Sequence, residues 1–238
     1  FAARSIRCVG AIDPSRLFQN IKKRFFRISL PYWITLAGAI AANEFARLFM
    51  TDEAISARPT WGQLAAHVVF VQDLCGYETL TAGIWYLAVD FQLYVLTLLT
   101  FYGSQQLLRS FHGTNGGAAW HVTLVALSPI AILSLLWFNR QSYLDCWAVY
   151  FLGSYYLGLL LHEATVNPSA VRWSVVYIGV ALVVGGIDSR PRIVVAALIT
   201  LLALTAHLTS FLQRWPRSRV INYLGRSSYC LFLVHFPV

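Results

Sequence analysis

A carboxylate lies inside an apolar stretch long enough to cross a membrane. Asp90 follows Gly83 by about two helical turns, and the chain continues with Val, Leu, Thr and Phe. Inserting an ionisable side chain at that depth costs roughly 2.5 kcal/mol or more, so such residues tend to be functional. Asp90 could handle a proton, orient a catalytic histidine or couple an ion. Alternatively, it could pair with an Arg, a Tyr or a backbone donor and fix helix packing.

Other polar side chains recur around this carboxylate at helical spacing. Tyr86, Tyr94 and Thr97 fall on the same helical face as Asp90, and the remaining positions are mostly Leu, Val and Phe. A polar stripe at membrane depth should face other helices or a wet cavity. We therefore expect this face to point inward.

Basic residues precede the first apolar stretch. Residues 1–27 carry seven of the 18 Lys and Arg, and Asp13, followed by a proline, predicts a helix start. From Ser15 to Arg27 we predict a basic amphipathic helix at the cytoplasmic face. Arg24 and Arg27 could anchor this helix to anionic headgroups. They could also hold a phosphorylated donor, because Arg binds phosphate bidentately.

Other potential catalytic groups give weaker signals. His235 lies in a short aromatic helix near the end of the sequence, where function and a simple bond to a backbone carbonyl are equally plausible. His207 lies in an apolar span and suits a packing hydrogen bond. The four cysteines show no CxxC spacing, and the sequence holds no HExxH or GxSxG motif. Neither a metal site nor a covalent serine mechanism is indicated.

The composition is that of a polytopic membrane protein. Of 238 residues, 58% are hydrophobic and 12% charged, with a mean hydropathy of +0.60, whereas soluble domains average about 25% charged residues. We predict an all-α transmembrane helix bundle. Residues 61–75 are too few for a full span and predict a short re-entrant or interfacial helix. About seven spans are expected: 28–50, 83–107, 118–138, 144–162, 171–187, 192–213 and a last helix from about 227.

The net charge of +8 is explained by membrane topology rather than by nucleic acid, which we do not expect as a partner. If the N-terminus is inside and 61–75 does not cross, 13 Lys and Arg lie inside and 5 outside. If that segment crosses, the numbers become 10 and 8. The positive-inside rule favours the first arrangement.

The chain divides into a basic cytoplasmic segment, 1–27, and a membrane domain, 28–238. It begins at Phe1, its only Met is Met50 within a predicted helix, and the last predicted helix is too short to span by Val238. We therefore expect the sequence to be incomplete at both ends.

Three stretches, in this order, resemble acyltransferase family 3, the OafA-like and nose-resistant-to-fluoxetine-like membrane O-acyltransferases. Lys23–Trp33 is similar to the family's Arg-rich entry followed by Arg-Ile-x-Pro-x-Tyr-Trp. Trp85–Tyr94 is similar to Trp-Ser-Leu-Ser-Val-Glu-x-Gln-Phe-Tyr, with Asp90 at the acidic position. Leu224–Val238 is similar to Leu-Gly-x-x-Ser-Tyr-x-Leu-Tyr-Leu-x-His-x-Pro.

This resemblance implies transfer of an acyl group, often acetyl, from acyl-CoA to a hydroxyl of a carbohydrate or envelope glycan. It implies a multi-pass protein of the bacterial inner membrane whose partners are membrane lipid, acyl-CoA as donor substrate, and a glycan acceptor, with no bound cofactor. The site residues implied are Asp90 and His235 for catalysis, Arg24 and Arg27 for the donor, and Trp85, Tyr86, Tyr94 and Tyr229 for the substrate cavity.

The resemblance also predicts a missing group. In the family the presumed catalytic His lies on a span that precedes the Arg-rich stretch, and none of the six His residues here matches it. A chain that begins at Phe1 should therefore be inactive, and Asp90 would support that absent base. Two other classes stay open: a proton-coupled secondary transporter using Asp90, and a non-catalytic membrane scaffold. Dependence on acyl-CoA separates the enzyme from both.

Overall fold

Helices are the regular secondary structure in the part of the chain that the structure describes. The structure is a computed structural model, and it describes residues 2–7, 13–49, 58–80, 84–111 and 116–211, with 219–221, 223–225 and 227–228 near the C-terminus. No strand occurs among these residues, so the predicted all-α class is confirmed.

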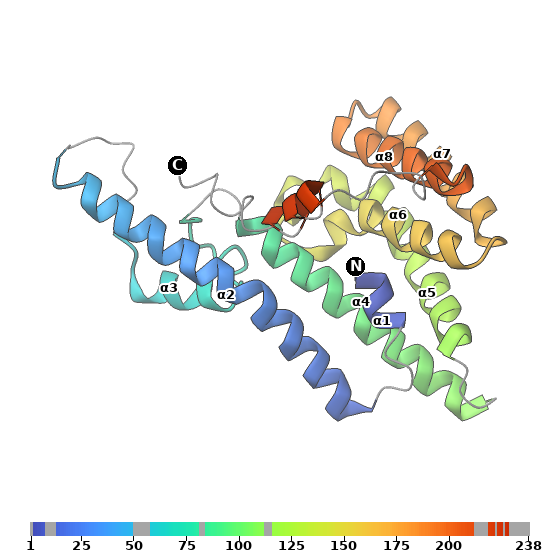
Figure 1. The fold of residues 1–238 in the computed structure, drawn as a ribbon, viewed down its shortest axis with the longest axis horizontal. Coiled ribbons are helices and arrows are strands. Elements are labelled where there is room, and N and C mark those ends of the chain that lie inside the picture. Colours follow the sequence, from blue (N-terminus) through green and yellow to red (C-terminus); the bar gives the residue numbers. More distant parts are fainter. Residues whose placement is uncertain are drawn as a thin grey trace. The chain divides into compact units, whose positions relative to one another are not determined.

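The described residues form eight α-helices that are long enough to be named, and Figure 1 labels them. They are α1 (Ala2–Arg7), α2 (Pro14–Ala46), α3 (Trp61–Val68), α4 (Ile84–Phe111), α5 (Gly116–Leu136), α6 (Ala148–Val166), α7 (Ala170–Ile187) and α8 (Pro191–Leu208). Two short 3-10 turns, Phe138–Arg140 and Ser142–Leu144, join α5 to α6.

Five of these helices, α2, α4, α5, α7 and α8, are both long and apolar enough to cross a membrane. About seven spans are predicted from the sequence, and five of them correspond to these helices of the described residues. The predicted span 144–162 corresponds to α6, which has 19 residues but also carries His162 and Glu163, and is not among the five. The last predicted helix, from about 227, lies largely outside the described residues.

The predicted basic helix and the first predicted span form one continuous helix, α2. Its start is capped as expected, because the backbone N–H of Arg16 donates to Asp13 Oδ1 at 3.1 Å. This bond holds the pKa of the exposed Asp13 carboxyl below its usual value. A helix of 33 residues is about 50 Å long, more than the ~30 Å hydrocarbon core, so its basic first turns can lie outside the membrane.

The helix predicted over Trp61–Cys75 is shorter than expected and ends at Val68. Its start is fixed by a capping box between Thr60 and Gln63. Its end is a Schellman turn, in which Val71 N–H donates to Ala66 O and Phe70 adopts a φ of 62°. The chain then folds back, and Leu80 N–H donates to His67 Nε2 at 3.2 Å.

The described residues divide into two compact units. The first comprises Phe1–Phe18 and Gln92–Pro216, and the second Gln19–Phe91 and Arg217–Val238. Within the first unit α6 packs against α5, α7 and α8, and α1 packs against α5 and α6. Two helices of this unit approach closely at Gly153, where an added Cβ would lie 2.7 Å from the Leu135 side chain.

The second unit has its own apolar core. Figure 1 shows the short helix α3 beside α2, and the Trp33 indole N–H donates to Val68 O at 3.2 Å. Aromatic and aliphatic side chains from α2, from the turn after α3 and from the start of α4 fill the space between them. The buried members are Ile28, Tyr32, Leu36, Phe70, Leu87 and Ala88.

Candidate functional site

Two of the predicted site residues contact each other within the second unit. Arg24 of α2 and Asp90 of α4 are 66 residues apart in sequence, and Arg24 Nη2 donates to Asp90 Oδ2 at 2.6 Å. Both side chains are mostly covered, with exposed fractions of 20% and 26%. Of the alternatives for Asp90, the structure therefore places this carboxylate against an arginine.

Aromatic packing brings this ion pair together. The residues that follow the two charges, Phe25 and Phe91, stack edge to face with ring centroids 5.6 Å apart. Phe25 also meets Phe70 at 5.6 Å, edge to face. Such aromatic pairs contribute about 0.5–1.5 kcal/mol beyond their buried area. The apolar neighbours thus fix the separation of α2 and α4 at which a 2.6 Å contact between the two charges forms.

The other predicted site residues near the Arg24–Asp90 pair differ in their solvent exposure. Arg27, one turn further along α2, is exposed. Trp85 and Tyr86 begin α4 and pack edge to face, with 38% and 53% of their surfaces exposed. Tyr86 lies one turn before Asp90, within electrostatic range of that carboxylate and of Arg24.

The polar stripe on α4 faces inward only in its second half. Tyr94 is 5% exposed and Thr97 is fully buried, both in the first unit, and the Thr97 hydroxyl donates to Leu93 O at 2.8 Å. Tyr86, at the start of the stripe, stays half exposed. His235 and Tyr229 lie outside the described residues.

The Arg24–Asp90 pair has a geometry that can hold the Arg24 guanidinium in one orientation. When a carboxylate accepts a hydrogen bond from a guanidinium, it restricts the orientation of the guanidinium plane. The N–H groups of a guanidinium held in this way can donate to two oxygens of one phosphate. Lys22, Lys23 and Arg27 are exposed on the same helix. The start of α2 therefore keeps a net positive charge after Arg24 is paired, and it can attract an anion.

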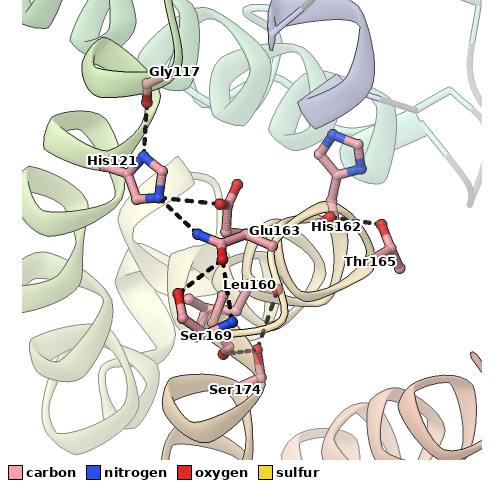
Figure 2. Close-up of polar contacts among 10 residues, drawn as sticks. Gly117, His121, Leu160, His162, Glu163, Thr165, Ser169 and Ser174 are labelled. Carbon is pink, nitrogen blue, oxygen red and sulfur yellow. Dashed lines mark hydrogen bonds and ion pairs between the residues drawn. The ribbon is translucent and has the colours of Figure 1, made fainter. Parts of the chain in front are cut away.

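A second polar cluster, in the first unit, was not predicted from the sequence (Figure 2). Glu163 near the end of α6 is 1% exposed, and its Oε1 lies 3.2 Å from Nε2 of His121 at the start of α5. Asn167 Nδ2 lies 3.2 Å from the same nitrogen, and its Oδ1 accepts from Ser169 N–H and Oγ–H. The available signal was a Glu at the inner end of an apolar run, where a buried carboxylate requires a partner.

The contacts of this cluster link two helices, α5 and α6. His121 Nδ1 lies 2.7 Å from Gly117 O and must carry the hydrogen, because a carbonyl only accepts. Nε2 lies 3.2 Å from both Glu163 Oε1 and Asn167 Nδ2, and it either donates to the carboxylate or accepts from the amide, because one ring nitrogen cannot do both at once. Both imidazole nitrogens are thus occupied, and His121 joins the start of α5 to the end of α6 instead of presenting a base to a substrate.

The five long apolar helices of the described residues are those of a multi-pass helical membrane protein. Residues 10–238 match the sequence model of the acyltransferase domain family, acyltransferase family 3. The match covers nearly the whole chain, so the chain belongs to this acyltransferase family. No curated protein and no solved structure gives a significant match.

Proposed function

We propose that this protein is a membrane-bound O-acyltransferase that moves an acyl group, foremost acetyl, from acyl-CoA to a hydroxyl of a carbohydrate or envelope glycan. We place it in the bacterial inner membrane. Membership of the acyltransferase family supports the reaction class. The observation that carries the proposal is the Arg24–Asp90 ion pair, because it sets an oriented guanidinium at the basic start of α2.

In this proposal Arg24 and Arg27 bind the phosphates of the acyl-CoA donor at the cytoplasmic side. Acyl-CoA is strongly anionic, and Arg is the side chain best suited to planar, bidentate contacts with phosphate. Asp90 acts as a positioning residue for Arg24. The acyl group passes from the donor sulfur to the acceptor oxygen, and the hydroxyl proton must go to a base while the CoA thiolate leaves.

The test is a label-transfer experiment with the full-length gene product. Membranes from expressing and non-expressing cells receive acetyl-CoA labelled in the acetyl group, and the label is followed into lipid-linked and envelope glycans. The expected result is label in a glycan ester that mild alkali removes. Label that stays with acetyl-CoA in both membranes would contradict the enzyme proposal.

The same membrane preparations can distinguish the enzyme from the alternative, a proton-coupled transporter. A proton-coupled transporter moves its solute in response to a pH gradient and needs no acyl-CoA. The Arg24 contact favours the enzyme, since a proton-carrying Asp90 would have to leave its ion pair in each cycle. Transfer that persists after an uncoupler collapses the gradient is the outcome expected here.

A further inference from the structure

The hydroxyl of Tyr32 differs from the neighbouring polar groups of α2. The Trp33 indole donates to Val68 O, and the Ser29 hydroxyl donates to Phe25 O at 2.7 Å. Tyr32 is 1% exposed, and its hydroxyl is buried with no hydrogen-bond partner. A buried hydroxyl without a partner costs about 1–3 kcal/mol, so native proteins rarely retain one without a reason.

A second buried polar atom without a partner lies in the same part of the second unit. Gln72 is fully buried, and its side-chain carbonyl Oε1 has no hydrogen-bond partner. The Tyr32 ring packs on Phe70 with centroids 5.3 Å apart, and the Tyr32 hydroxyl is within electrostatic range of Asp73. Gln72 Nε2 donates to Asp73 Oδ2 at 3.0 Å. Both atoms thus belong to the contact between α2 and the turn after α3.

The backbone holds this turn in place. Phe70 keeps a left-handed conformation, which costs roughly 1–3 kcal/mol for such a residue and persists where the surroundings impose it. Gln72 O accepts from Cys75 N–H at 3.2 Å and from Tyr77 N–H at 2.9 Å. The Gln72 side chain therefore projects from a loop whose backbone is held in place.

The two groups specify the chemistry of their ligand. Tyr32 offers an O–H donor and Gln72 Oε1 is an acceptor, and a hydroxyl group is able to accept from the first and donate to the second. A carbonyl would satisfy only Tyr32. An anionic phosphate or carboxylate would face Gln72 Oε1 and the half-buried Asp73 carboxylate, and would be repelled.

We propose that Tyr32 and Gln72 bind a neutral hydroxyl group of the acceptor alcohol. This assignment rests on the acyltransferase function proposed above. It divides the second unit into an arginine region for the anionic donor and a neutral hydroxyl site eight residues further along α2. At 1.5 Å per residue, the two regions are about 12 Å apart along the helix axis.

Glucose serves as the probe, and the purified full-length gene product as the protein. We expect its thermal unfolding midpoint to rise saturably with glucose, whereas trimethylamine N-oxide, an excluded osmolyte that has no hydroxyl group, should raise the midpoint only in proportion to its concentration. Tyr32→Phe should weaken the apparent affinity for glucose about tenfold, the value of one hydrogen bond. Without glucose, the variant should unfold at or above the wild-type temperature, because no hydrogen bond is lost and the cost of an unpartnered buried hydroxyl is removed.

A matched control is Tyr177→Phe. The Tyr177 hydroxyl is also buried, but it donates to Ala131 O and Gly153 O. This variant should lose stability and keep its glucose response. Gln72→Met should weaken glucose binding as Tyr32→Phe does, and the double variant should be no worse than either single one, since both contact one hydroxyl.

Two results would overturn the hydroxyl site: a wild-type protein that gains no stability from glucose, as expected if only water fills the site, or a Tyr32→Phe variant that responds as the wild type does. The proposed function is tested separately. A Tyr32-dependent glucose response without any transfer from labelled acetyl-CoA would reject the enzyme and retain the hydroxyl site.

Discussion

At the scale of single residues, the central feature is a carboxylate that meets an arginine across two helices. Asp90 and Arg24 are each about one-fifth to one-quarter exposed, so their contact is screened less than a surface pair and more than a fully buried one. Its value therefore lies more in orienting Arg24 than in stability. This distinction has a measurable consequence.

Asp90→Asn should impair donor binding while the protein still folds. The amide keeps the size of the carboxylate but loses the charge that holds the Arg24 guanidinium. We expect the KM for acetyl-CoA to rise about tenfold, a loss of about 1.4 kcal/mol, with the KM for the acceptor unchanged. Donor titrations in membranes with equal protein levels measure this.

Arg24→Lys is the companion variant, because it keeps the charge and loses the planar, bidentate geometry. It should raise the same KM. Asp90→Ala should abolish transfer at an unchanged membrane level. Full transfer by the Asp90→Ala protein would remove Asp90 from the mechanism.

At the scale of elements, the first unit depends on close contact between α5 and α6. Gly153 permits this contact, since its N–H donates to Ser134 Oγ at 2.9 Å and its carbonyl accepts from the Tyr177 hydroxyl. Small residues serve such contacts in membrane bundles, where packing and interhelical hydrogen bonds replace the hydrophobic effect.

Gly153→Ala should therefore destabilise the first unit. The new Cβ would lie 2.7 Å from Leu135 and 3.1 Å from Ala131 O, and a backbone carbonyl cannot move away cheaply. Overpacking of this kind costs about 1–3 kcal/mol. The control is Gly158→Ala in the same helix, where nothing lies within 4 Å and a higher helix propensity should add up to about 1 kcal/mol. Equal unfolding midpoints for the two variants would contradict this packing.

In the turn between α7 and α8, a substitution to glycine is expected to stabilise the protein. Ser189 is exposed and has a φ of 51° in a Schellman turn, where Arg190 N–H donates to Gly185 O at 2.8 Å. The neighbouring Asp188 accepts from Arg140, and this bond holds the pKa of its carboxyl below the usual value.

Ser189→Gly should raise the free energy of unfolding by about 0.5–1 kcal/mol, because glycine removes the left-handed penalty but adds entropy to the unfolded chain. Ser189→Ala should give no gain, since the strained φ remains. Denaturant titrations of the two variants in one detergent provide the comparison. A gain with alanine as large as that with glycine would place the effect in the side chain and not in the backbone.

At the scale of the whole molecule, the sequence predicted those features that depend on local pattern. Apolar runs indicated the membrane helices, and the Asp13 cap indicated the start of α2. Partners remote in sequence were not predictable, because a period gives the face of a helix and not what packs against it. The Glu163–His121 contact, 42 positions apart, and the buried hydroxyl of Tyr32 became apparent only in three dimensions.

The segment around α3 also required the structure. Its amphipathic pattern continues to Cys75, but the helix ends at Val68 because Phe70 reverses the chain. Gln63, at the start of α3, then donates through Nε2 to Glu78 O at 2.9 Å. Two residues joined by a hydrogen bond cannot lie on opposite sides of a ~30 Å hydrocarbon core. The segment therefore enters and leaves on one side, as the positive-inside count favours.

Single-cysteine labelling of the whole protein tests this topology. The native Cys75, which is exposed, reports on the residues after α3. Leu48→Cys reports on the end of α2, where the native side chain is 77% exposed, and Lys22→Cys reports on its basic start. In each protein every other cysteine is replaced by serine. An impermeant maleimide added to intact cells should label positions 48 and 75, and should reach position 22 only after permeabilisation.

The reason is that an eight-residue helix rises only about 12 Å, so α3 cannot carry the chain across the membrane. Positions 48 and 75 must then share a side, and the many cations near position 22 keep that end in the cytoplasm. Labelling of position 48 in intact cells together with protection of position 75 would mean that the segment crosses. The second unit would then have to open the Gln63–Glu78 and His67–Leu80 contacts that close it in this structure.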